Sequence, residues 1–244
     1  YDITFINRNV GKKATTYLQH CQYRGVDGVV IACVDFNDPQ VLELVNSKLP
    51  VVTIDHVFNN RAAVVSDNVR GMEELVRYVY AKGHRRIAFI HGEQTAVTEN
   101  RLTGFYRACD ALELEIPDAY IREGVYHDPD RCAELTRELL RLPEPPTCIL
   151  MPDDFSSIGG RNAIHRMDLR LPEDISVAGY DGIQIASVMS PALTTYRQDT
   201  QALGRTAAAK LIELIEKPRT ALVDRVLIPG HLVEGASVRA IETL

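Results

Sequence analysis

The feature that most constrains the fold of this chain of 244 residues is a regular alternation of helical and strand patterns. Apolar residues over 72–80 follow the i, i+3, i+4, i+7 spacing of one buried helix face. Residues 203–215 follow a similar spacing before Pro218 ends the pattern. We therefore predict a helix over each of these two segments, and shorter apolar segments between such helices are typical of strands.

The predicted strands are short, apolar on both faces and rich in valine and isoleucine, which is the pattern of parallel strands covered by helices on both sides. Their alternation with helices predicts a doubly wound α/β fold. Because their number exceeds what one open sheet usually holds, we expect two sheets in two lobes. The predicted strands are 3–6, 28–33, 51–54, 63–66, 86–90, 147–151, 175–179 and 193–196, with weaker candidates at 119–122 and 225–233.

Composition excludes several classes of protein. Hydrophobic residues make up 45% and charged residues 25%, which are ordinary values for a globular chain. No apolar run approaches the roughly 20 residues of a membrane span. The net charge is −6, and no basic stripe of the kind that binds nucleic acid is present. We expect the densest basic cluster, at 84–86, to be a solvated turn.

Signatures of catalysis and of metal binding are missing from the sequence. GxSxG, GxxxxGK[ST], GxGxxG and HExxH do not occur. The five cysteines lack CxxC spacing, so we expect buried small apolar side chains in a reducing cytoplasm. Asp153 and Asp154 are adjacent and would point in different directions, so we predict neither a metal nor a cofactor there. The glycines at 159–160 lie in a helical pattern and favour close packing.

Polar residues instead follow the predicted strands, where ligands of open α/β sheets bind. Each aspartate after a strand could instead cap the next helix, and this reading carries most weight for Asp154. Together, carboxylates and one arginine suit a ligand rich in hydroxyl groups, and Tyr126 could provide a flat surface under a sugar ring. The residues after strands are Asp55, His91, Gly92, Asp153, Asp154, Tyr180, Asp181 and Gln198, with Arg101 near a helix start.

Several segments resemble the lactose-repressor (LacI/GalR) family of bacterial regulators. The clearest is LPEDISVAGYD at 171–181, and SPALTTYRQ at 190–198 leads into Leu203-Gly204. The order and spacing of the motifs agree from end to end, so the resemblance covers essentially the whole chain. The other matching segments are 25–30, 65–68, 83–90 and 101–105.

The resemblance implies a two-lobed fold like that of periplasmic binding proteins of type I. Each lobe would be a parallel sheet flanked by helices, with three crossovers and a ligand between the lobes. The N-terminal lobe would hold 1–66 and about 199–226, and the C-terminal lobe about 67–198 and 227–244. The crossovers would lie near 66–67, near 197–198 and near Leu227.

The resemblance also implies site residues and partners. Asp153 stands where asparagine is common, and Gly182 stands where a second aspartate is frequent, which leaves the identity of the ligand open. Ile158 and Met189 match positions in the family's dimer interface, although ordinary core packing would also explain them. The matching ligand contacts are Asp55, Arg101, Tyr126, Asp153, Asp181 and Gln198.

The function implied is that of the effector-binding and dimerisation core of a cytoplasmic transcription repressor, which catalyses nothing and needs no cofactor. A small carbohydrate-like effector would change the spacing of two headpieces on operator DNA. The headpiece and the first strand and helix of the first lobe are absent from this sequence, so we expect the natural protein to be longer. Two alternatives stay open: a periplasmic sugar-binding protein of a transport system, and an enzyme on a similar scaffold.

Overall fold

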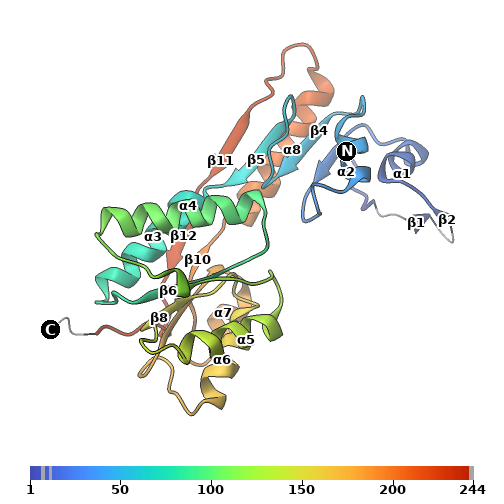
Figure 1. The fold of residues 1–244 in the computed structure, drawn as a ribbon. Helices are drawn as coiled ribbons and strands as arrows, with labels where there is room; N and C mark the ends of the chain where they lie inside the picture. Colours follow the sequence, from blue (N-terminus) through green and yellow to red (C-terminus); the bar gives the residue numbers. More distant parts are fainter. Residues whose placement is uncertain (7–8, 11–12, 242–244) are drawn as a thin grey trace. The chain divides into compact units, whose positions relative to one another are not determined.

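The computed structural model describes residues 1–6, 9–10 and 13–241 of the chain. The chain forms two compact units (Figure 1). The N-terminal unit consists of Tyr1–Ser66 and Thr200–Ile228, and the C-terminal unit of Asp67–Asp199 and Pro229–Leu244. The chain therefore passes from one unit to the other after Ser66, Asp199 and Ile228.

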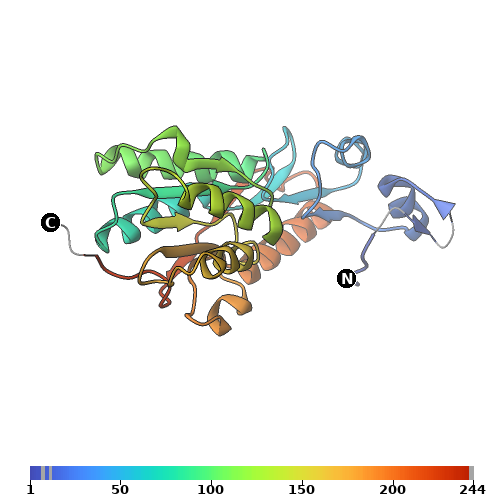
Figure 2. The same ribbon diagram turned by 60° about the horizontal axis from the view of Figure 1, so that its bottom comes forward.

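The N-terminal unit is built on a parallel sheet with the strand order β11-β5-β4-β3. Its strands are β3 (Val29–Ile31), β4 (Val51–Ile54), β5 (Ala62–Ser66) and β11 (Arg225–Ile228). Its helices are α1 (Tyr17–Arg24), α2 (Pro39–Val45) and α8 (Thr200–Glu216), and β1 (Asn9–Val10) pairs with β2 (Lys13–Ala14) in a separate antiparallel ribbon. Helix α8 lies against β4 and β5 (Figures 1 and 2).

The C-terminal unit contains a six-stranded sheet with the order β12-β10-β9-β8-β6-β7, which is parallel except for β12. Its strands are β6 (Ile87–His91), β7 (Ile121–Glu123), β8 (Cys148–Leu150), β9 (Ser176–Asp181), β10 (Thr194–Arg197) and β12 (His231–Val233). Its helices are α3 (Asn68–Ala81), α4 (Ala96–Ala111), the short 3-10 helix η1 (Asp118–Tyr120), α5 (Pro129–Leu140), α6 (Ser157–Arg166) and α7 (Gln184–Val188).

Successive residues of β6 in the C-terminal unit enter different cores. Ile87 and Phe89 pack with α3 and α4, whereas Ala88 and Ile90 pack with α5 and α6. This alternation follows from the period of two in a strand. Because both faces of the sheet are covered (Figure 1), β6 is apolar on both sides. The predicted α/β class with parallel sheets and flanking helices is confirmed.

One predicted strand is wrong. Residues 1–6 form no strand, and the side chains of Ile3 and Phe5 are exposed. A strand requires a paired neighbour, and the apolar pattern of 3–6 could not show whether one lies beside it. The candidate at 225–233 is two strands, β11 and β12, which belong to different sheets.

Two expectations about single residues also need correction. His84 is buried rather than solvated, because its ring bonds to the Thr147 hydroxyl and to the carbonyl of Arg239. Cys33 is exposed just after β3 and has a positive φ of 55°, whereas the other four cysteines are buried. All five are free thiols. No helix among the described residues is long and apolar enough to cross a membrane.

Gly159 allows α5 and α6 to pack closely, as the glycine pair in the helical pattern indicated. A Cβ at Gly159 would lie 1.6 Å from the carbonyl oxygen of Pro129, in the first turn of α5. We expect Gly159→Ala to force these helices apart and to lower the free energy of unfolding by about 1–3 kcal/mol or more, measured by urea denaturation.

The matched control for this substitution is Gly204→Ala in α8. Gly204 is also inside a helix, but a Cβ there would meet no atom within 4 Å. Alanine is the better helix former, so this substitution should stabilise its unit by about 0.5–1 kcal/mol. Equal effects of the two substitutions would contradict the close packing at Gly159.

Candidate functional site

The predicted polar residues of the C-terminal unit gather at the carboxyl edge of its sheet. Strands β6, β8, β9 and β10 are parallel neighbours, so their carboxyl ends share that edge. Asp181 is the last residue of β9, Gln198 directly follows β10, and Pro152 follows β8. The fold therefore brings together residues that are far apart in the sequence.

Arg101 is the buried centre of this site, with 3% of its surface exposed. It projects from α4, and its Nε donates to Asn68 Oδ1 at 2.9 Å. Its Nη1 donates to the carbonyl oxygen of Pro152 at 2.8 Å, and its Nη2 to Asp181 Oδ1 at 3.1 Å. The guanidinium also lies 3.7 Å from the centre of the Tyr180 ring, in cation–π geometry. Three of its five N–H groups thus have fixed partners.

Asp181 is held from two directions. Oδ1 accepts from Arg101 and, at 2.6 Å, from Nε2 of Gln198. Its φ is 100°, a left-handed conformation that is unusual for a residue other than glycine. Strained backbone of this kind is concentrated at binding sites. The side chain of Asp181 keeps 20% of its surface exposed, so it is the member of the ion pair that solvent or a ligand can reach.

Tyr126 lies beside the guanidinium of Arg101. Its ring centre is 5.4 Å from the guanidinium carbon of Arg101, and its hydroxyl bonds to Thr98 Oγ1 at 2.9 Å. A Cβ at Gly92 would lie 2.2 Å from the ring, so glycine after β6 makes room for the tyrosine. Burial raises the pKa of the Tyr126 hydroxyl, which keeps it neutral at physiological pH.

Burial and neighbouring charges set the protonation of two further side chains, Arg101 and Asp154. Burial alone would lower the pKa of Arg101, but the groups around it, Tyr126 and Asp181 first among them, raise it overall. Asp154 is fully buried, and burial raises its pKa to about 7, although hydrogen bonds from Thr195 and Ile183 partly oppose this. The site therefore contains a permanent cation and a carboxyl group that titrates near neutrality.

Asp153 lies in a different environment from the one expected for a ligand contact. Its side chain is fully buried, and its oxygens accept from the amides of His127 and Ser156 and from the Ser156 hydroxyl. It thereby ties the loop before α5 to the turn before α6. This placement does not support direct contact between the Asp153 carboxylate and a ligand.

The remaining predicted residues lie outside the group of side chains that contact Arg101. Asp55 belongs to the N-terminal unit, where it follows β4 with a φ of 58° and accepts from the amide of Ser66 at 2.7 Å. Ile158 lies in α6, and Met189 follows α7; both are half-buried. Gly182 has a φ of 69°, and a Cβ there would lie 2.3 Å from Cβ of Arg197, which explains why glycine stands at this position.

Sequence reasoning missed one side-chain partner of Arg101. Asn68 begins α3, is buried and accepts from the guanidinium. It belongs to a motif that already pointed to the family, so it could have been suspected. Tyr180, which the sequence placed after a strand, lies under the guanidinium. Among the described residues, no group of three or more histidine, cysteine, aspartate or glutamate side chains could hold a metal ion.

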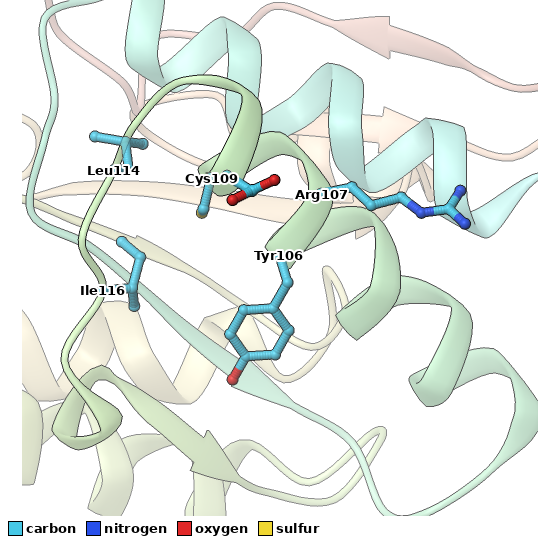
Figure 3. A pocket seen from close by; sticks show the side chains of 6 residues that line it. Tyr106, Arg107, Cys109, Leu114 and Ile116 are labelled. Atoms are coloured by element: carbon cyan, nitrogen blue, oxygen red, sulfur yellow. The ribbon is translucent and has the colours of Figure 1, made fainter.

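A separate cavity of about 490 Å³ lies at the carboxyl end of α4 (Figure 3). Tyr106, Leu114 and Ile116 surround it together with Arg107, Cys109 and Asp110. None of the predicted site residues lines it. Arg101 lies in the first half of the same helix, so the cavity and the ion pair are distinct features.

Comparisons with known proteins agree with this geometry. Residues 76–238 match the periplasmic binding protein-like domain family. The chain is 30% identical over 237 residues to the HTH-type transcriptional repressor PurR of Escherichia coli O139:H28 (strain E24377A / ETEC), covering 93% of this chain and 69% of that protein.

Solved structures of transcription regulators also resemble this chain. A regulatory protein of the LacI family from Chloroflexus aggregans superposes with a TM-score of 0.79 at 28% identity, covering 91% of this chain and 80% of the other. The transcriptional regulator CelR in complex with cellobiose gives a TM-score of 0.78 at 28% identity, covering 87% and 66%. The chain belongs to the LacI/GalR family of transcription regulators, as an effector-binding core with the periplasmic-binding-protein-like fold.

Proposed function

We propose that this core senses a small, hydroxyl-rich effector through Arg101, Asp181, Gln198 and Tyr126. The observation that carries the proposal is the buried Arg101–Asp181 ion pair at the carboxyl edge of the sheet, with Asp181 still partly exposed. A carboxylate accepts hydrogen bonds from ligand hydroxyl groups, and an aromatic ring packs against the apolar face of a sugar. Cellobiose in the related CelR complex is a ligand of this class.

Asp55, which follows β4, is a further ligand contact in this proposal, and the resemblance to the family supports it. An effector changes the balance between two states of a protein only by its different affinity for each. In the complete regulator, that difference would act on a DNA-binding headpiece in the cytoplasm, without catalysis. The similarity to PurR and CelR favours a regulator over a transport protein.

The dimer surface belongs to the same proposal. Ile158 and Met189 would lie on an interface formed by α6 and α7, where Val188 is 72% exposed. Apolar side chains that are exposed together often mark interaction sites. We expect Val188→Asp to shift the chain from dimer to monomer in sedimentation equilibrium, and an unchanged mass would contradict this interface.

The effector is identified by a thermal-shift screen with D-ribose, cellobiose, other mono- and disaccharides, sugar acids and nucleosides. For the compound that raises the melting temperature, we expect Asp181→Ala to weaken binding in calorimetry. The loss of charge-assisted hydrogen bonds should cost about 1.5–3 kcal/mol for each bond.

Asp110→Ala is the matched control, because it removes an exposed carboxylate that lines the cavity of Figure 3. Binding that survives in Asp181→Ala and is lost in Asp110→Ala would move the effector site to that cavity.

A further inference from the structure

The turn that follows Asp181 is fastened to two buried side chains. The amide of Ile183 donates to Asp154 Oδ2 at 2.8 Å, and the amide of Gly182 donates to Thr195 Oγ1 at 3.3 Å. The Thr195 hydroxyl in turn donates to Asp154 Oδ1 at 2.6 Å. The backbone amides of the two residues directly after Asp181 thus donate hydrogen bonds to one connected pair of side chains, which we name the Asp154–Thr195 clamp.

Both members of the clamp are shielded from water. Asp154 has no exposed surface and Thr195 has 1%. A Cβ at Gly179 would lie 2.3 Å from Asp154 Oδ1, so glycine in β9 lets the strand pass directly beside the carboxylate. A buried carboxylate that accepts from an amide and a hydroxyl is costly to disturb, because its loss leaves buried donors without an acceptor.

The clamp acts on a strained segment. Asp181 has a φ of 100° and Gly182 a φ of 69°. In Asp181 such a conformation persists only where the surrounding structure enforces it, whereas a glycine adopts it readily. Arg101 and Gln198 hold the carboxylate of Asp181, whereas the clamp holds the backbone that follows. We propose that Asp154 and Thr195 are positioning residues, which fix the turn 181–183 and thereby the direction in which Asp181 faces a ligand.

Because the carboxyl group of Asp154 can lose or gain a proton, this role should depend on pH. The groups around its carboxylate are Asp181 on β9, Thr195 on β10 and the amides of Gly182 and Ile183 in the turn, while its chain neighbour Asp153 has other partners. Asp153 is itself bonded to Ser156 and His127. Protonation of Asp154 at Oδ1 would reverse the bond to Thr195 and leave the threonine proton without that acceptor. The hydrogen bonds of the clamp should therefore be stronger above neutral pH than below it.

Hydrogen exchange of backbone amides, followed by NMR on the whole chain without any effector, tests the clamp directly. Between pH 8 and pH 6 we expect the protection factors of the Gly182 and Ile183 amides to fall about five- to tenfold, the equivalent of one hydrogen bond. The amide of Val177, which lies in β9 and donates to the carbonyl oxygen of Ser237, should not show this fall. A role in general stability would change all three amides together.

Variants separate the clamp from other causes. Thr195→Val should lower the protection of Gly182 and Ile183 at pH 8 by a similar factor, and Thr195→Ser should restore it. Thr136→Val is the control, because Thr136 is equally buried but bonds to Cys132 in α5. Asp154→Asn should give low protection without a pH step, whereas His127→Gln, which removes the exposed histidine beside Asp153, should keep the step.

Two results would overturn the proposal: wild-type protection of the turn in Thr195→Val, or a wild-type pH step in Asp154→Asn. The relevance of the clamp to effector binding rests on the proposed function of Asp181. Because the exchange experiment contains no effector, a failed effector screen would leave its outcome intact, and the two hypotheses can be judged separately.

Discussion

Replacing Arg101 by methionine should lower the free energy of unfolding of the C-terminal unit by about 3–5 kcal/mol and abolish effector binding. The substitution removes hydrogen bonds to Asn68, Pro152 and Asp181, and it leaves the Asp181 charge without its cation. Methionine fills a similar space and packs well on the Tyr180 ring, so loss of volume contributes little. Urea denaturation followed by tyrosine fluorescence measures the effect, since the chain has no tryptophan.

Two further variants identify the cause of that loss. Arg107→Met removes an exposed arginine from the same helix, and its effect should stay within about 0.5 kcal/mol. Arg101→Met combined with Asp181→Asn should recover part of the lost stability, because the unpaired charge is gone and asparagine tolerates a positive φ. Effector binding should not return. Equal stability of Arg101→Met and Arg107→Met would show that the ion pair does not support the fold.

The sequence was sufficient to place Asp181 and Gln198 in one region, because the convergence of residues that follow parallel strands depends only on topology. Parallel strands that alternate with helices have their carboxyl ends at one edge, and the predicted strands before Asp181 and Gln198 are neighbours in the sheet. The continuous apolar run of β6 likewise predicted burial on both faces, which the two separate cores of the C-terminal unit confirm.

The sequence could not show the partners that come from a distant part of the chain. Asp153 follows a strand as expected, but the amide of His127 reaches its carboxylate from the loop before α5. His84 has the composition of a surface turn, yet the carbonyl of Arg239, 155 positions later, lies against its ring. Residues 3–6 have the pattern of a strand, and pattern alone does not supply a neighbour. Single-sequence patterns report burial and period, but not which distant group satisfies a polar atom.

The C-terminal unit should show little change in stability between pH 7 and pH 5, because two buried groups act in opposite directions. Burial lowers the pKa of His84 to about 4, below its ordinary value of 6.5. The unfolded chain therefore binds the proton first, and the stability due to neutral His84 is lost as the pH falls through 6.5 toward 4. Over this interval we expect a loss of about 2 kcal/mol.

Asp154 has the opposite effect. Burial raises its pKa from 3.8 to about 7, so the folded unit binds the proton first and gains stability as the pH falls below 7. The expected gain between pH 7 and pH 5 is also about 2 kcal/mol. Most exposed carboxyl groups titrate below this interval and contribute little.

Single substitutions should expose each effect in urea denaturation at pH 5, 6 and 7. Asp154→Asn removes the gain, so its unfolding free energy should fall toward acid by about 2 kcal/mol. His84→Gln removes the loss while keeping an amide that can donate to the Arg239 carbonyl, and its stability should rise toward acid by a similar amount. The neutral His84 ring carries its proton on Nε2, since a carbonyl only accepts, and Nδ1 then accepts from the Thr147 hydroxyl. If the unfolding free energies of the two variants changed with pH in the same direction, the two groups would not act in opposite directions. Opposite slopes would show that His84 and Asp154 each contribute one of the two effects.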